Sequence, residues 1–106
     1  MGITEEVAAR AGIPVVTRGG GEYVHSGYVE RFLNEARAQR LGLLGLEGFQ
    51  LFEDATVPDM NAILDLSDLE SDVNFVDCSI DQALSFVRNI AAPDMYFEFV
   101  LELRSP

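Results

Sequence analysis

The chain has 106 residues, a formal net charge of -11 and an apolar fraction of 48%, which is typical of one folded domain and not of an acidic disordered tail. A single cysteine excludes an internal disulfide, and a strongly negative chain repels nucleic acid. No signal peptide and no apolar run of about 20 residues is visible, so we expect a cytoplasmic protein that does not enter a membrane.

Residues 1–25 look irregular. Residues 1–13 predict a short helix capped by Thr4, and their sequence resembles the first helix of a helix-turn-helix DNA reader. Pro14 and the glycines at 19–21 then follow where a recognition helix should begin. This break and the negative charge argue against DNA binding. We expect residues 1–25 to be a loosely attached arm with a glycine-rich break, and residues 26–106 to form one α+β domain.

The first regular elements after the arm are a helix and a strand. Ser26 is the predicted N-cap of a helix that runs through Arg40, with Gly42 just beyond it as a residue that tolerates positive φ. Residues 41–52 are apolar on both faces, which favours a central strand. A turn is expected at residues 53–56.

Later elements alternate strand, helix, strand. Residues 62–67 predict a second strand, and Pro58 before it predicts a turn. Ser79 and Gln82 have the spacing of a capping box at the start of a helix, which Pro93 would end. Residues 95–104 predict the last strand, with alternate apolar residues on one face and Glu98 and Glu102 on the other.

This order, α-β-β-α-β, predicts an α+β fold. A helix between the last two strands makes a crossover connection, so those strands should run parallel. We expect a small mixed sheet of three to four strands, with two helices packed on one face.

Candidates for catalysis and metal binding are sparse. His25 is the single histidine, and no nucleophile or orienting carboxylate can be paired with it by spacing, which favours a surface loop residue and no enzyme. Cys78 lacks electropositive neighbours and reads as a small structural residue. The acids at 65, 68, 70 and 72 lack the EF-hand spacing. We therefore expect a solvated face, with no metal and no cofactor.

The middle of the chain carries only negative charges. From Leu41 to Val87 there are ten carboxylates and no lysine or arginine. We predict that eight of them bind a basic protein partner, because such a field steers cationic surfaces toward it. These eight are Glu47, Glu53, Asp54, Asp59, Asp65, Asp68, Glu70 and Asp72; the other two are Asp77 and Asp81.

A family resemblance points the same way. Residues 36–40, followed by Leu-Gly-Leu-Leu-Gly-Leu-Glu-Gly at 41–48, resemble the opening of the immunity proteins that neutralise anticodon-cleaving tRNase colicins. The helix from Ser79 and the strand at 96–103 match that family's ending in type and order. About half of the chain is covered: residues 1–25 are extra, residues 53–77 do not align, and no tryptophan follows the glycine motif. The resemblance implies a small bacterial inhibitor that fills a toxin's RNA-binding cleft with acidic groups; Glu47 alone carries over by position.

These observations lead to one functional hypothesis and two alternatives. The first is an immunity or inhibitor protein that blocks the basic RNA- or DNA-binding cleft of a nuclease toxin. The second is a non-enzymatic homo-oligomer, such as a homodimer, completed through Phe97, Phe99 or residues 41–52. The third is a small ligand-binding protein or enzyme.

Overall fold

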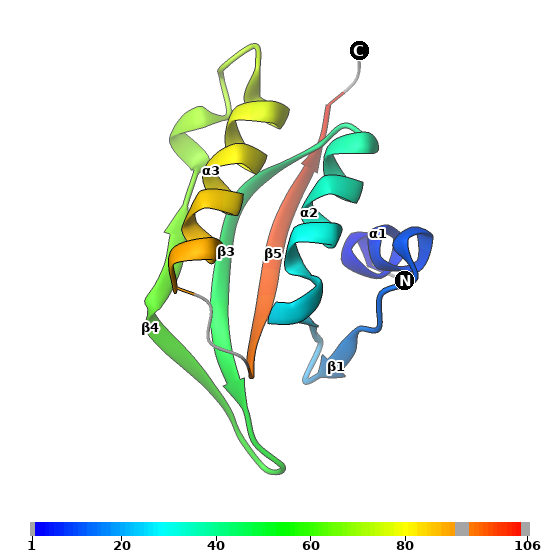
Figure 1. The fold of residues 1–106 in the computed structure, drawn as a ribbon, viewed down its shortest axis with the longest axis vertical. Coiled ribbons are helices and arrows are strands. Elements are labelled where there is room, and N and C mark those ends of the chain that lie inside the picture. The colour runs from blue at the N-terminus through cyan, green and yellow to red at the C-terminus, as the bar shows by residue number, and fades with distance from the viewer. Residues whose placement is uncertain (1, 91–93, 105–106) are drawn as a thin grey trace.

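In the computed structural model, which describes residues 2–90 and 94–104, five strands form one sheet and two helices cover one of its faces (Figure 1). A third helix packs beside them. In chain order the elements are α1 (Ile3–Ala11), β1 (Val16–Arg18), β2 (Gly21–His25), the 3-10 helix η1 (Ser26–Tyr28), α2 (Val29–Ala38), β3 (Leu41–Leu51), β4 (Thr56–Asp65), the 3-10 helix η2 (Ser67–Leu69), α3 (Phe75–Ile90) and β5 (Met95–Leu103). The predicted α+β class is confirmed.

The strand order is β1-β2-β5-β3-β4, and every neighbouring pair is antiparallel. Since β4 and β5 are both antiparallel to β3, they run in the same direction, as predicted, but β3 lies between them. The sheet is therefore antiparallel with five strands, and not the mixed sheet of three to four strands that we expected. The last strand inserts into the middle of the sheet and bonds to β2 and β3.

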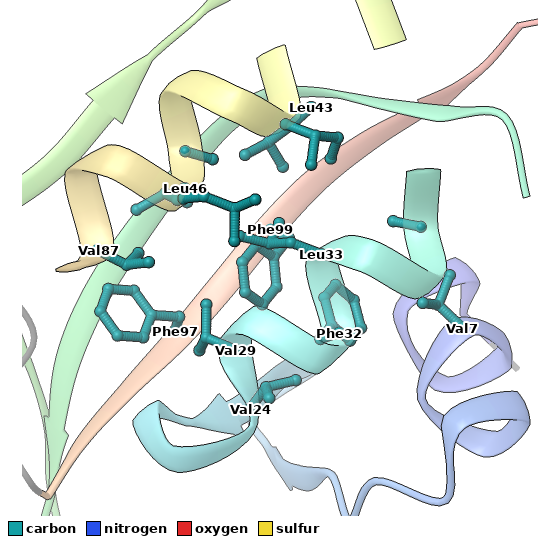
Figure 2. Close-up of a cluster of buried hydrophobic side chains, with 14 of the residues drawn as sticks. Val7, Val24, Val29, Phe32, Leu33, Leu43, Leu46, Val87, Phe97 and Phe99 are labelled. Carbon is teal, nitrogen blue, oxygen red and sulfur yellow. The ribbon is translucent and has the colours of Figure 1, made fainter. Parts of the chain in front are cut away.

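The core lies between the sheet and the helices α2 and α3 (Figure 2). Phe32 of α2 stacks on Phe99 of β5 with ring centroids 4.5 Å apart. Phe32 and Phe97 are fully buried. The alternation predicted for the last strand is confirmed, because Phe97 and Phe99 face this core while Glu98 faces away from it.

Residues 2–25 are not a loosely attached arm. Val7 and Ala8 of α1 are buried in the core, and Val24 of β2 pairs with Phe97 of β5. The glycine run makes the turn of a hairpin: Gly19 and Gly20 connect β1 to β2 with φ of 53° and 86°. Positive φ at both turn residues is the geometry of a type I′ hairpin, which glycine adopts without strain.

Four predicted caps are wrong, three of them at α1 and α2. Thr4 is buried inside α1, whose N-cap is Gly2. Ser26 lies within η1, and the cap there is His25, whose Nδ1 accepts a hydrogen bond from the Gly27 N–H at 3.1 Å. The positive φ after α2 falls at Arg40 and not at the glycine two residues later.

Gly42 is required for a different reason, namely close packing of α3 against β3. A Cβ on Gly42 would come within 2.2 Å of the Phe75 ring. Phe75 is buried at the start of α3, so the ring has no room to withdraw. This glycine lets the helix approach the strand.

Ser79 is not a helix cap, because α3 begins four residues earlier at Phe75. Ser79 is fully buried, and its Oγ accepts a hydrogen bond from the Leu43 N–H at 2.9 Å and donates to the Val76 carbonyl at 3.2 Å. The pairing of β3 with β5 shifts register between Leu43 and Gly45. Ser79 therefore supplies the partner for a strand N–H beside a β-bulge. The predicted helix end at Pro93 lies outside the described residues.

Strand β4 begins at Thr56, six residues before the predicted start at residue 62. Pro58 was expected to mark a turn, but it lies inside the strand, which an edge strand tolerates. The pairing with β3 shifts between Glu47 and Phe49, and the Asp59 carboxylate accepts a hydrogen bond from the Asn61 N–H in the extra loop of β4. The strand is therefore longer and more irregular than its sequence indicated.

One carboxylate pair in the N-terminal region gives a test of this packing. Burial raises the pKa of Glu22, and a hydrogen bond with Glu5 raises it further. The folded protein therefore binds this proton more tightly than the unfolded chain does. This binding stabilises the fold at pH values below the pKa of Glu22 in the unfolded chain, and the stabilisation is lost as the pH rises through the pKa of Glu22 in the folded protein. Glu22→Gln is expected to raise the Tm at pH 7 by no more than about 2 °C, because the residue is only half-buried and solvent screens its carboxylate.

Thermal unfolding followed at pH 7 and pH 4 checks this expectation. The gain should be smaller at pH 4, where the Glu22 carboxyl is largely protonated. Glu53→Gln, which removes an exposed charge from the turn after β3, serves as the control and should change the Tm less. An equal gain at both pH values would contradict the assignment.

Candidate protein-binding surface

The β3–β4 hairpin projects from one end of the molecule. Pairing between β3 and β5 stops at Gln50, beyond which Leu51 pairs with Thr56 of β4 (Figure 1). The Phe52 N–H donates to the Ala55 carbonyl at 2.8 Å and closes the turn. Arg18 of β1 donates from Nη1 to the Phe52 carbonyl and, at 3.2 Å, to the Ala55 carbonyl. A residue from the N-terminal hairpin thus holds both ends of this turn.

The predicted acidic residues follow this hairpin and the segment that leads from it to α3. Glu47 lies in β3, Glu53 and Asp54 in the turn, and Asp59 and Asp65 in β4. The remaining three, Asp68, Glu70 and Asp72, lie in η2 and the loop after it. We call these eight carboxylates, with the residues between them, the acidic edge. All eight are exposed or half-buried.

None of these eight carboxylates takes part in the five ion pairs that the described residues form. Arg37 of α2 binds Asp77 at 3.0 Å and Asp81 at 2.6 Å, both on α3. Arg88 binds Glu30 at 2.7 Å, again between the two helices. The other two pairs join Arg104 to Glu102 and His25 to Asp94.

The consequence is an uneven distribution of charge. Asp77 and Asp81 belong to the same acidic stretch of sequence, yet the helix layer neutralises them through Arg37. Arg18 and Arg104 do reach the acidic edge, but they donate to backbone carbonyls there, Arg104 to that of Glu70 at 2.5 Å. No ion pair therefore neutralises the carboxylates of β4 and its flanks, although Glu70 hydrogen-bonds Glu102, the partner of Arg104.

Three acids of the acidic edge also shape the backbone. The carboxylates of Asp59, Asp65 and Asp72 each accept a hydrogen bond from the N–H two residues ahead, at 2.7–2.9 Å. Such turns are a common role for aspartate. The Ser67 hydroxyl also donates to Asp65, and these bonds lower the pKa of that carboxyl. The turns fix these three carboxylates in place.

A shallow hollow lies on the uncovered face of the sheet. It has a volume of about 180 Å³, and its walls include Glu47, Asp65 and Glu98. Glu47 and Glu98 are directly opposite each other on β3 and β5. Like charges in that position destabilise a sheet. Burial raises the pKa of Tyr23 on the same face, and both glutamates raise it further.

Two features of this surface were missed in the sequence. Glu98 joins Glu47 through strand pairing that the sequence does not reveal, although its place on the polar face of the last strand was visible. Exposed apolar side chains also gather on the hairpin: Phe52 is 54% exposed and Met60 75% exposed, with Val57 and Ile63 nearby in the chain. The turn predicted after Phe52 was the one available signal for its exposure.

The remaining candidates lie away from the acidic edge. Asp94, which spacing did not connect to His25, has its Oδ1 3.9 Å from the His25 Nε2. Phe97 and Phe99 are buried in the chain's own core, so they do not offer the homo-oligomer interface expected of them. Among residues 2–90 and 94–104, no cluster of three or more histidine, cysteine, aspartate or glutamate residues has the geometry to hold a metal ion. Within the same residues, none of the helices has the length and apolar character that a membrane span requires.

Comparisons of the chain with protein-family models, with curated proteins and with solved structures find no match. What the surface can do chemically therefore follows from its own groups. Uncompensated carboxylates attract cations over a distance set by the salt concentration. Exposed apolar side chains beside them gain stability when a partner covers them. The combination suits a protein partner with a cationic surface.

Proposed function

We propose that this chain is an inhibitor of the immunity-protein type, which binds the basic nucleic-acid cleft of a nuclease toxin through its acidic edge. The observation that carries the proposal is the uneven charge. Arginines pair Glu30, Asp77 and Asp81 of the helix layer, whereas the eight carboxylates of the acidic edge form no ion pair among the described residues. The sequence resemblance to tRNase-colicin immunity proteins supports the same assignment.

The physical argument concerns complementarity. A nuclease cleft must be cationic to hold phosphates, and a protein that fills it does best by placing carboxylates where phosphates would lie. Charges of one sign speed the encounter between the two proteins and oppose wrong partners. The apolar side chains on the same hairpin supply surface to bury, which charge alone does not.

The proposal is tested with the protein encoded by the adjacent gene. Co-expression should rescue cells from that protein if it is toxic, and the two should co-purify. The Kd is expected to rise at least about tenfold when salt is raised from about 0.05 M to about 0.5 M, because screening weakens attraction between charged surfaces. Isothermal titration calorimetry over this salt range measures the effect. A Kd that stays constant would refute a charge-based interface.

Charge reversal locates the surface. Glu47→Lys and Asp68→Lys are expected to weaken this binding, whereas Glu6→Lys on α1, an exposed acid away from the acidic edge, is the matched control. Loss of binding in all three variants would indicate that total charge matters and the acidic edge does not.

A homo-oligomer is the alternative. The exposed apolar residues of the edge strand β4 favour it, but pairing two copies through β4 brings like charges together, which is unfavourable. Light scattering separates the two: the inhibitor is expected to show the 11.7 kDa mass of one chain.

A further inference from the structure

We infer that the hairpin tip, residues 52–55, is the part that enters the partner's nucleic-acid cleft, with Phe52 in place of a base and Glu53 and Asp54 in place of phosphates. The inference rests on the function proposed above and identifies which portion of the acidic edge makes the central contact.

The shape of the tip suits insertion. Beyond Gln50 the hairpin leaves the cover of β5, and Figure 1 shows its turn at the far end of the molecule from the end of β5. The longest dimension of the protein is 42 Å, and this hairpin forms one end of it. A projecting turn reaches into a concave cleft, whereas the flat face of the sheet does not.

Phe52 supplies the apolar contact. Its side chain is 54% exposed in a protein whose other large aromatic rings at 32, 75 and 97 are buried. Clefts that hold single-stranded nucleic acid present aromatic or cationic groups on which bases stack. An exposed phenylalanine at a turn can occupy such a position and bury its ring there.

The charges are placed beside it. Glu53 and Asp54 follow Phe52 directly, and both are exposed. Neither pairs with an arginine in the part of the chain that the structure describes. An aromatic ring followed in the chain by two exposed carboxylates offers the same two kinds of group as a nucleotide, a ring and negative charge, which a cationic cleft is built to hold.

Arg18 acts as a positioning residue for the tip. Its guanidinium donates to the carbonyls of Phe52 and Ala55 and not to the neighbouring carboxylates. The turn is therefore held in one shape while its charges stay available. A loop fixed before binding loses less conformational entropy on association.

The alternatives are disfavoured by charge. A second copy of this chain brings its own carboxylates, and a membrane surface is itself anionic. A cationic cleft complements both the ring and the acids.

The experiment uses the protein of the adjacent gene, inactivated at its catalytic site, together with a fluorescent single-stranded RNA. The unaltered chain is expected to displace the RNA. Phe52→Ala and the double variant Glu53→Gln/Asp54→Asn should each raise the Kd about tenfold or more. The double variant should also flatten the salt dependence, which Phe52→Ala should leave as it is.

Matched controls keep the test specific. Val73→Ala removes an apolar side chain that is 93% exposed outside the hairpin, and Glu6→Gln/Asp81→Asn removes two exposed charges from the helices α1 and α3. Both controls should bind like the unaltered chain. Arg18→Ala should weaken binding with its salt dependence unchanged, and Arg18→Lys, which keeps a donor, should restore part of it. Thermal unfolding confirms that every variant is folded.

The outcomes separate the two proposals. If the unaltered chain does not bind, the proposed function falls and the role of the tip falls with it. If it binds but the tip variants bind equally well, or if the RNA stays bound in the complex, the role of the tip alone is overturned. Weaker binding by the tip variants with unchanged controls supports both.

Discussion

Replacing Phe32 with alanine is expected to lower the free energy of unfolding by about 3–5 kcal/mol, the usual cost of removing a buried phenylalanine. Phe32 is completely buried on α2 and stacks on Phe99 of β5 at 4.5 Å. The alanine variant loses both the burial and the stacking, and leaves a cavity between helix and sheet. Urea unfolding followed by circular dichroism measures the change.

The same substitution at Phe52 is the control, because that ring is 54% exposed. Phe52→Ala is expected to change stability by no more than about 0.5 kcal/mol. A double-mutant cycle between Phe32 and Phe99 should give a coupling of about 0.5–1.5 kcal/mol from the ring pair. Equal losses at Phe32 and Phe52 would contradict the division between core and binding surface.

This division bears on the proposed function, since it separates the buried aromatic residues that build the core from Phe52, whose ring is exposed. The homo-oligomer hypothesis relies on Phe97 and Phe99, whose alternation shows an apolar face but not what covers it. Two helices of the same chain cover that face. The periodicity of apolar residues predicts that one face of a strand is buried, but only the tertiary structure shows which elements cover that face.

Local patterns predict most of the elements correctly. The last strand is the clearest case, because apolar residues occupy every second position over nine residues and Glu98 and Glu102 lie between them. The strand from Leu41 and the helix after η1 also lie where their patterns indicate. The order of strands in the sheet is not predictable in this way, because β5 pairs with β2 and β3 through contacts between distant parts of the chain.

The N-terminal hairpin has a sequence signal that is easily misread. Three glycines in a row suggest a flexible break, but two of them are the residues that a two-residue hairpin turn requires. Short strands such as β1, with three residues, give little alternation to confirm the turn. Because that hairpin was not predicted, the contact of Arg18 with the tip of the β3–β4 hairpin could not be predicted either.

For the proposed binding surface, the sequence predicts the acids and the structure adds their surroundings. Counting charges selects the eight residues of the acidic edge, but it places Asp77 and Asp81 in the same field, although Arg37 pairs with both. Glu98 lies outside the acidic stretch and faces Glu47 across the sheet. The sequence shows where the charges lie along the chain, and the fold determines which of them form ion pairs.

Ser79→Ala is expected to lower the free energy of unfolding by about 1–3 kcal/mol, because it leaves the Leu43 N–H buried without an acceptor. Leu43 and Ser79 are both fully buried, and the bond between them is 2.9 Å long. Alanine favours a helix more than serine does by at most about 0.5 kcal/mol, which offsets only part of the loss. Ser85→Ala, an exposed position on the same helix, should change stability little.

Amide hydrogen exchange distinguishes this role from helix capping. A lost cap would weaken the start of α3 and leave the exchange of the Leu43 amide at its global rate. Loss of the bond to β3 should instead make the Leu43 amide exchange faster than its neighbours. This bond holds the β-bulge between Leu43 and Gly45, and Gly45 lines the hollow that Glu47 and Glu98 share on the other face of the sheet. The same variant should therefore also weaken partner binding. A variant that binds normally while Leu43 exchanges freely would indicate that the hollow plays no part in the interface.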